Sequence, residues 1–412
     1  MNLERLLERF CRYVKVDTTA NAAATTYPSS AGQLELGKLL VGELRELGLA
    51  DVEQDADGLV WATLPGNTKH AVDAIALCAH FDTSPETTGK NVRPTVWRNY
   101  AGGDLTLPGD PAKVLKVADN PALKEYVGQT IVTSDGTTLL GADDKAGIAV
   151  IVEALAYLSE HPQLEHGPVR VCFTCDEEIG HGVDKLNPRK LAAVCCYTLD
   201  GSGRDLIDVE TFSADLAIVS VRGINIHPSI GKGRMVNAVR AAAKFLDLLP
   251  HAMSPERTDE REGFLHPYTI EGGVAETKIH ILLRSFDEAE LATQAELLRK
   301  AAQDVEAEFP RVAVDVNVTA QYRNMAAGLA KEPRAVAYAE QAHRNLGRNP
   351  QRTIIRGGTD GSRLTEIGVP TPNLSTGEQN PHSPLEWCCL EDLGRAAEVL
   401  VELAQVWARG GK

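Results

Sequence analysis

The feature that most constrains the fold is a series of short apolar runs, each leading into residues that can bind a metal ion. These segments are AIALCAHFD (74–82), LLGADDKAG (139–147), VRVCFTCDEE (169–178), CCYTLDG (195–201) and TGEQNPHSP (376–384). Continuous apolar runs of this kind are typical of buried parallel strands. Because ligands bind at the carboxyl ends of the strands in open α/β sheets, the pattern predicts an α/β fold with a site at that edge.

The polar residues at these strand ends form a coherent set of metal-type ligands. Two imidazoles and at least three carboxylates are what a pair of divalent ions binds in proteins. Taken singly, each residue is more often a helix cap or a surface residue. Their joint occurrence in this order favours a metal site. The candidates are His80, Asp82, Asp143, Glu177, Glu178, Asp200 and His382.

Three of these segments indicate distinct roles. Asp82 lies two residues after His80, within reach of the imidazole, where a carboxylate would fix the ring tautomer. Asp143 precedes an apolar helix pattern, in a turn where a carboxylate could bridge two ions. In an extended segment Glu177 and Glu178 diverge, so one can bind metal while the other acts as general base. We assign Glu177 as the base, although spacing alone would allow the exchange.

The ordered motifs along the whole chain resemble those of the peptidase T family. These motifs are HFDTSP, TLLGADDKAGIA, FTCDEEIG, YTLDG, NIHPSIGKGRMVNA, RGGTDG and PNLSTG. The family comprises tripeptide aminopeptidases among the dizinc exopeptidases, related to glutamate carboxypeptidase and succinyl-diaminopimelate desuccinylase. The resemblance implies a mixed sheet flanked by helices, an inserted α+β lid domain, and two Zn²⁺ ions per subunit.

Carried over position by position, the resemblance implies a role for each site residue. The metal ligands would be His80 and Asp200 on one zinc, Glu178 and His382 on the other, and Asp143 between them. The catalytic residues would be Glu177 as general acid/base, Asp82 orienting His80, and His227 assisting the scissile carbonyl. Arg284 and Arg356 would hold the substrate carboxylate, a task suited to a guanidinium fork.

The assignments outside the metal set have simpler alternatives. His227 precedes Pro228, which also fits an extended loop residue. Arg284 ends a strand-like run, where an exposed charge would be unremarkable. Two positions depart from the family pattern: Leu385 replaces a second histidine, and Cys175 replaces a more usual proline. Neither departure removes a predicted ligand.

Length and charge restrict the class of protein. A chain of 412 residues implies about two domains. A formal net charge of -15 argues against nucleic acid or an anionic membrane as a partner. The amino terminus has the pattern of an amphipathic helix, not of a signal peptide. We interpret the eight cysteines as small buried residues in a reducing compartment. Together with the amino-terminal pattern, they predict a cytoplasmic protein.

The pattern of elements changes from about residue 212. A first part of the metal domain is predicted at 1–211, an inserted domain at 212–323 and a second part of the metal domain at 324–412. The insert has the predicted order βαββαβ, with helices at 235–249 and 287–308. It could also provide the edge of a homodimer. Residues 85–130 are predicted to form an irregular insertion beside the metal site.

The predicted function is a zinc-dependent aminopeptidase that releases the N-terminal residue of free tripeptides by metal-hydroxide attack. Two alternatives stay open on the residues alone. The same metal core serves dizinc carboxypeptidases and N-acyl-amino-acid deacylases. A non-catalytic peptide-binding module could also retain the fold.

Overall fold

The computed structural model describes residues 1–411 and divides into two compact units. Unit 1 contains Met1–Val209, Met325–Thr353 and the described chain from Thr359 onward. Unit 2 contains Glu210–Asn324 and Ile354–Gly358. Within the described residues no helix has the length and apolar character needed to cross a membrane.

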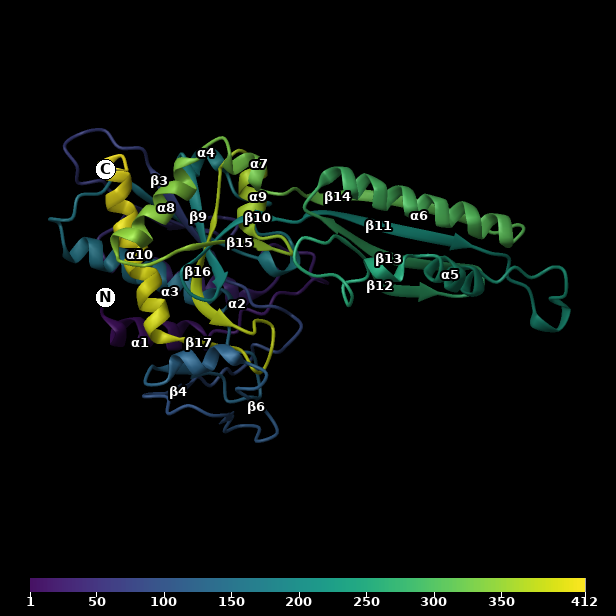
Figure 1. Ribbon diagram of the computed structural model, residues 1–412, viewed down its shortest axis with the longest axis horizontal. Helices are drawn as coiled ribbons and strands as arrows, with labels where there is room; N and C mark the ends of the chain where they lie inside the picture. The colour runs from purple at the N-terminus through teal and green to yellow at the C-terminus, as the bar shows by residue number, and fades with distance from the viewer. Residues whose placement is uncertain (412) are drawn as a thin grey trace. The chain divides into compact units, whose positions relative to one another are not determined.

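The centre of unit 1 is a mixed sheet whose middle strands are parallel (Figure 1). The parallel strands, in spatial order, are β8 (Val169–Thr174), β3 (Ile75–His80), β9 (Cys195–Ser202) and β16 (Asn373–Gln379). Antiparallel strands continue the sheet on both sides. These are β2 (Val60–Leu64) and β1 (Ala50–Gln54) beyond β8, and β17 (Trp387–Cys389), β7 (Ile131–Thr133) and β4 (Thr95–Trp97) beyond β16. The α/β fold with a mixed sheet is confirmed.

Helices cover both faces of this sheet, because successive strand residues are apolar and point to opposite sides. The larger core includes α1 (Leu3–Tyr13), α2 (Ala31–Glu46), α3 (Ala142–Glu160), α8 (Arg334–Asn345) and α10 (Leu390–Arg409). The smaller core, on the other face, includes α4 (Pro188–Leu191) and α9 (Asp360–Glu366). Gly147 allows α3 to pack closely on β9, since a Cβ there would lie 2.2 Å from the carbonyl oxygen of Leu199.

The stretch between β3 and α3 is largely irregular, as predicted. It contains only short elements: β4, β5 (Leu105–Thr106), β6 (Val114–Leu115), the 3₁₀ helix η1 (Pro121–Tyr126) and β7. A small apolar cluster that includes Tyr100, Leu123, Tyr126 and Trp387 packs this stretch onto β17. Unit 1 also contains the short helix α7 (Ala326–Leu329). The strands β10 (Leu206–Thr211) and β15 (Gln351–Ile355) begin in unit 1 and end in residues assigned to unit 2.

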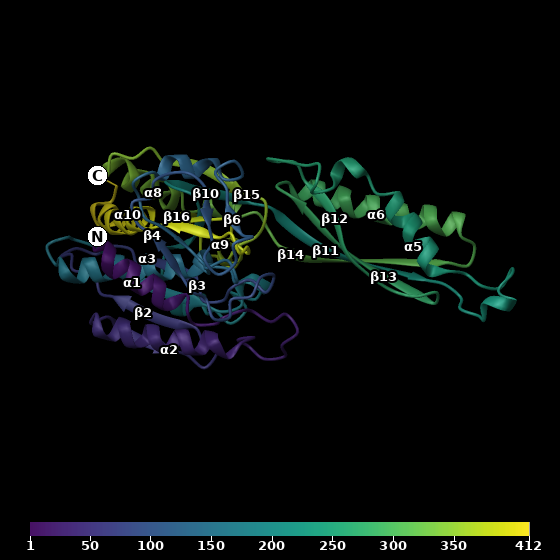
Figure 2. The same ribbon diagram turned by 90° about the horizontal axis from the view of Figure 1, so that it is seen from below.

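Unit 2 is a four-stranded antiparallel sheet with two helices on one face (Figure 2). In chain order its elements are β11 (Ser213–Arg222), α5 (Ala238–Asp247), β12 (Phe264–Gly272), β13 (Glu276–Ser285), α6 (Glu288–Glu308) and β14 (Ala313–Tyr322). Alternate residues of β11 and β13 are buried against the helices, which gives this unit its own apolar core. The predicted βαββαβ order is confirmed.

Candidate metal centre

Candidate ligands converge at the carboxyl ends of the parallel strands of unit 1. They form two groups, His80–Asp143–Asp200 and Asp143–Glu178–His382, which share Asp143. Within each group the potential donor atoms all lie within 4.8 Å of one another. The structure therefore brings together all five residues predicted as ligands.

The first group surrounds the buried imidazole of His80. Its Nε2 lies 3.0 Å from Oδ1 of Asp143 and 3.6 Å from Oδ1 of Asp200. β3 and β9 are parallel and pair in register from Ile75 with Cys195 to Cys78 with Thr198. This register, continued two residues further, aligns His80 with Asp200, so both point to the same face of the sheet. Burial raises the pKa of Asp200 to about 6, because the carboxylate has lost water and lies beside Asp143.

The second group surrounds the imidazole of His382, which follows β16 in a loop. Its Nε2 lies 2.9 Å from Oε2 of Glu178 and 3.2 Å from Oδ2 of Asp143. The two oxygens of Asp143 thus face different histidines. The other oxygen of Glu178, Oε1, is buried and has no hydrogen-bond partner in the described chain. A buried carboxylate oxygen left in this state is suited to a cation, so the donor set fits two metal ions.

The position of Asp143 depends on the irregular start of α3. Gly141 has a φ of +82°, and Asp143 and Asp144 have non-helical backbone angles before the helix continues. The prediction that a strand leads into this turn is wrong, since Leu139 and Leu140 belong to no strand. The irregular start of the helix, not a strand end, therefore presents the carboxylate.

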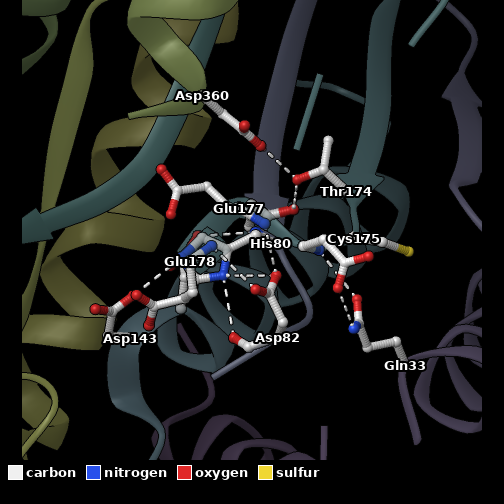
Figure 3. Close-up of polar contacts among 12 residues, drawn as sticks. Gln33, His80, Asp82, Asp143, Thr174, Cys175, Glu177, Glu178 and Asp360 are labelled. Atoms are coloured by element: carbon white, nitrogen blue, oxygen red, sulfur yellow. Dashed lines mark hydrogen bonds and ion pairs between the residues drawn. The ribbon is translucent and has the colours of Figure 1, made fainter. Parts of the chain in front are cut away.

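Asp82 supports both His80 and the glutamate turn. Its two carboxylate oxygens accept hydrogen bonds from the backbone N–H groups of Glu177 and Glu178, each at 3.0 Å. The Nδ1 of His80 is 3.1 Å from the backbone oxygen of Asp82 and 3.5 Å from its carboxylate. Figure 3 shows these residues grouped around the imidazole. The carboxylate thus holds the turn directly, and the main chain of Asp82 faces the ring.

Glu177 lies beside the ligands in a 3₁₀ turn, η2 (Glu177–Ile179). The sequence predicted an extended segment here, and this is wrong, because Asp176 is left-handed, with a φ of +63°, and Glu177–Ile179 form a 3₁₀ turn. The two glutamates still have different surroundings, since Glu178 belongs to a ligand group and Glu177 does not. Burial raises the pKa of Glu177 well above its ordinary value, and nearby carboxylates add to this effect.

A second set of hydrogen bonds fixes Asp176, the residue at the start of this turn. The Nε2 of Gln33 donates to Oδ1 of Asp176 at 2.7 Å, and the N–H of Asp176 donates to Oε1 of Gln33 at 3.1 Å. The backbone N–H of Ser29 donates to Oδ2 at 2.7 Å. Gln33 in the first turn of α2 and Ser29 just before that helix therefore hold the turn at 176–179 in place.

Comparison with known proteins bears on what this arrangement is for. Residues 134–406 match the sequence profile described as Peptidase family M20/M25/M40. The chain is 42% identical to the peptidase T of Bacillus subtilis (strain 168), over 98% of this chain and 98% of that protein. The chain belongs to the M20/M25/M40 peptidase family. It is accordingly an enzyme that hydrolyses peptide bonds.

Solved structures of this peptidase family have the same fold. The aminopeptidase PepT from Bacillus cereus ATCC 10987 has a TM-score of 0.77 at 26% identity, with 99% of each chain covered. A tripeptidase from Staphylococcus aureus has a TM-score of 0.79 at 25% identity, also with 99% of each chain covered. A dinuclear metal binding peptidase of the M20 family from Bacillus subtilis shares the fold, with a TM-score of 0.64 at 15% identity, over 98% of each chain.

The peptidase has a supporting residue that sequence reasoning missed, Glu386. Its buried carboxylate accepts four backbone N–H groups, from Leu140, Gly141, Ala142 and Asp143, at 2.6–3.1 Å. It therefore holds the turn that presents the shared ligand. Its place four residues after His382 was the only signal in the sequence, because contacts with backbone N–H groups leave no pattern of residue types.

Further buried carboxylates of the peptidase were also not predicted. Asp144 and Glu378 form a third possible ligand group with Asp200. Asp144 accepts the backbone N–H of His80 at 3.1 Å. Asp360 of the RGGTDG motif accepts a hydrogen bond from the hydroxyl of Thr174, at the end of β8, at 2.6 Å (Figure 3). The doublet Asp143–Asp144 and the motif itself were visible, but their packing was not.

The three remaining predicted site residues lie in unit 2. His227 is exposed and begins the 3₁₀ helix η3 (Pro228–Ile230), where its Nδ1 lies 2.7 Å from Oγ of Ser229. Arg284 is half-buried at the end of β13. It donates to Oε1 of Gln321 at 3.0 Å, and its guanidinium lies 5.3 Å from the ring centre of Tyr322.

Arg356 of the peptidase has a dense set of contacts within unit 2. Its Nη1 donates to the carbonyl oxygens of Glu260 and Glu262, at 2.9 and 3.0 Å. Its Nη2 donates to Oγ1 of Thr258 at 2.9 Å. The guanidinium also lies 5.2 Å from the ring centre of Phe212. Both terminal nitrogens therefore have acceptors already, which the sequence could not indicate.

Proposed function

We propose that the chain is an aminopeptidase that removes the N-terminal residue from free tripeptides with the help of two Zn²⁺ ions. One observation carries this proposal: two ligand groups meet at the two oxygens of Asp143, beside Glu177, which belongs to neither group. The names of relatives that align along the whole chain support the choice of substrate.

The residues of unit 1 would hold the ions as two sites with one shared ligand. His80 and Asp200 would bind one ion, Glu178 and His382 the other, and Asp143 both. A mixture of imidazole nitrogens and carboxylate oxygens suits zinc, although cobalt and manganese accept the same donors. When bound, the ions would polarise the scissile carbonyl and lower the pKa of a water molecule.

Glu177 would move the proton in this reaction. Asp82 fixes the backbone N–H of Glu177, so the side chain of the glutamate extends from a rigid turn. In this place its carboxylate would take a proton from the attacking water and deliver it to the departing amine. Asp82 and the main chain around it would keep the imidazole of His80 oriented.

The proposed substrate contacts come from unit 2. His227 would donate to the oxyanion, and Arg284 and Arg356 would bind the C-terminal carboxylate of the peptide. Arg284 supports this role because its guanidinium stacks on Tyr322, and its recorded hydrogen bonds, to Gln321 and to the backbone oxygen of Leu283, both come from Nη1. For Arg356 the role requires an exchange of acceptors, because its terminal nitrogens contact the main chain of 258–262.

Location and assembly are separate parts of the proposal. All eight cysteines, each within the described residues, are thiols, which supports a cytoplasmic location. We also propose that unit 2 acts as a lid and as the edge of a homodimer.

The decisive experiment is hydrolysis of matched free dipeptide, tripeptide and tetrapeptide, with an N-acetyl tripeptide as control. We expect cleavage mainly of the free tripeptide, loss after chelation, and recovery with zinc. Cleavage of the acetylated peptide alone would instead indicate a deacylase, and release of the C-terminal residue a carboxypeptidase. Peptide binding without cleavage in the zinc-loaded protein would indicate a binding module.

A further inference from the structure

The two candidate metal-binding histidines have different surroundings. The side chain of His80 is 2% exposed, whereas that of His382 is 36% exposed. His382 also has a φ of +62°, a left-handed conformation that is uncommon outside glycine. Contacts from elsewhere in the chain must therefore stabilise His382 and its loop.

Two consecutive residues of the segment after β3 supply such contacts. The carboxylate of Glu86 lies 3.3 Å from Nδ1 of His382. The hydroxyl of Thr87 donates to the backbone oxygen of His382 at 2.7 Å. One residue thus faces the ring and the next fixes the main chain of the same histidine.

The geometry of the ring decides what Glu86 can do. Nε2 of His382 faces Glu178 and Asp143, so this nitrogen is the one available to a metal ion. A neutral imidazole that binds a metal through Nε2 must carry its proton on Nδ1. Glu86 is placed to accept that proton in a hydrogen bond, which orients the ring and increases its basicity.

The rest of the irregular stretch supports the same loop. The side chain of Asn380 donates to Oδ1 of Asn120 at 2.7 Å and to the backbone oxygen of Leu385 at 3.2 Å. Asn380 is also left-handed, with a φ of +53°. The segment between β3 and α3 is therefore joined to the ligand loop at several points, and Glu86 is its contact with the imidazole.

We propose that Glu86 is the positioning residue of His382 and controls the affinity of only one of the two metal sites. This inference rests on the proposed dinuclear centre. His80 is independent of Glu86, because its Nδ1 faces Asp82 in the buried part of the site. Removal of the Glu86 carboxylate weakens the ion bound by Asp143, Glu178 and His382 and leaves the other ion in place.

The test is a calorimetric titration of the full-length, metal-free protein with zinc. Metal analysis after dialysis against a competing chelator gives a second measure of how many ions stay bound. We expect wild type to bind two ions. In Glu86→Gln, one ion should bind about tenfold more weakly, a typical effect of losing such a partner, while the other keeps its affinity. Glu86→Asp should recover part of the loss, and Thr87→Val should weaken the same ion.

Glu125→Gln is the matched control, since Glu125 is an exposed glutamate of the same stretch. It should bind both ions as wild type does. Unchanged affinities in Glu86→Gln, or equal weakening of both ions, would overturn the inference and leave the dinuclear centre intact. Fewer than two ions in wild type would overturn the proposed centre itself, so the two failures are distinguishable. Circular dichroism of the metal-free variants separates loss of a ligand contact from misfolding.

Discussion

Glu177 lies next to the candidate ligands, and its backbone N–H is fixed by Asp82. Replacing it by glutamine removes the proton acceptor and keeps the shape of the side chain. We expect Glu177→Gln to lower kcat by at least about 10²-fold, the lower end for loss of a general base. Metal analysis should still find two ions, because Glu177 belongs to neither ligand group. Full activity in this variant would contradict the assigned role.

Replacing Glu386 tests whether its carboxylate stabilises the turn at 140–143. In Glu386→Gln the new amide NH₂ faces backbone donors, so some of the four N–H groups that the carboxylate accepts lose their partner. Each buried unsatisfied group costs about 1–3 kcal/mol, and we expect a loss of about 2–4 kcal/mol in the free energy of unfolding. Urea unfolding of metal-free protein measures it. The exposed Glu8→Gln should remain close to wild type.

The two kinds of site residue differ in how visible they were in the sequence. His80, Asp200 and Glu178 could be predicted because each closely follows an apolar run, and such runs are a property of residue types. Glu386 and Asp144 could not, because their partners are backbone N–H groups, which every residue but proline carries.

At the scale of elements, the strongly apolar segments were predicted well and the turns were not. The helix α3 and the strands β3, β8 and β9 lie where their patterns place them. The turn at 176–179 was mistaken for an extended segment. Aspartate tolerates a positive φ, but most aspartates do not adopt one. At Asp176 this conformation is accompanied by hydrogen bonds from Gln33 and Ser29, which are distant in the sequence.

The stability of the folded chain depends on pH through His343, a residue of helix α8. Burial lowers the pKa of this imidazole, whose Nδ1 faces the backbone oxygen of Ala339; nearby Asp205 opposes the shift, and Arg348 and Arg395 add to it. The unfolded chain therefore binds a proton below about pH 6.5 that the folded chain does not. Stability falls as pH falls below that value, until the pH passes the folded pKa.

His343→Asn should remove this dependence, since asparagine keeps a donor near Ala339 and does not titrate. We expect the free energy of unfolding of wild type to decrease more steeply than that of the variant between about pH 7 and pH 5. Denaturant unfolding at several pH values measures both curves. Parallel curves would show that His343 does not contribute.

At the scale of the whole molecule, the two units have separate apolar cores. All five candidate ligands lie in unit 1. Metal binding should therefore stabilise unit 1 selectively, by about 4 kcal/mol for each bound ion when the free ion is 1,000 times above the Kd of that site. In calorimetry, chelation should lower the Tm of one transition and leave that of unit 2 in place. A single transition that shifts as a whole would show that the units unfold together.

Ile354–Gly358 makes unit 2 discontinuous in the sequence, because this short stretch rejoins it after Met325–Thr353 of unit 1. Arg356 anchors the stretch to the carbonyl oxygens of Thr258, Glu260 and Glu262. Recombination that exchanged 210–324 as one block would pair this arginine with a foreign loop. We therefore expect residues 210–324 and 354–358 to be inherited together, and a chimera has to carry both segments.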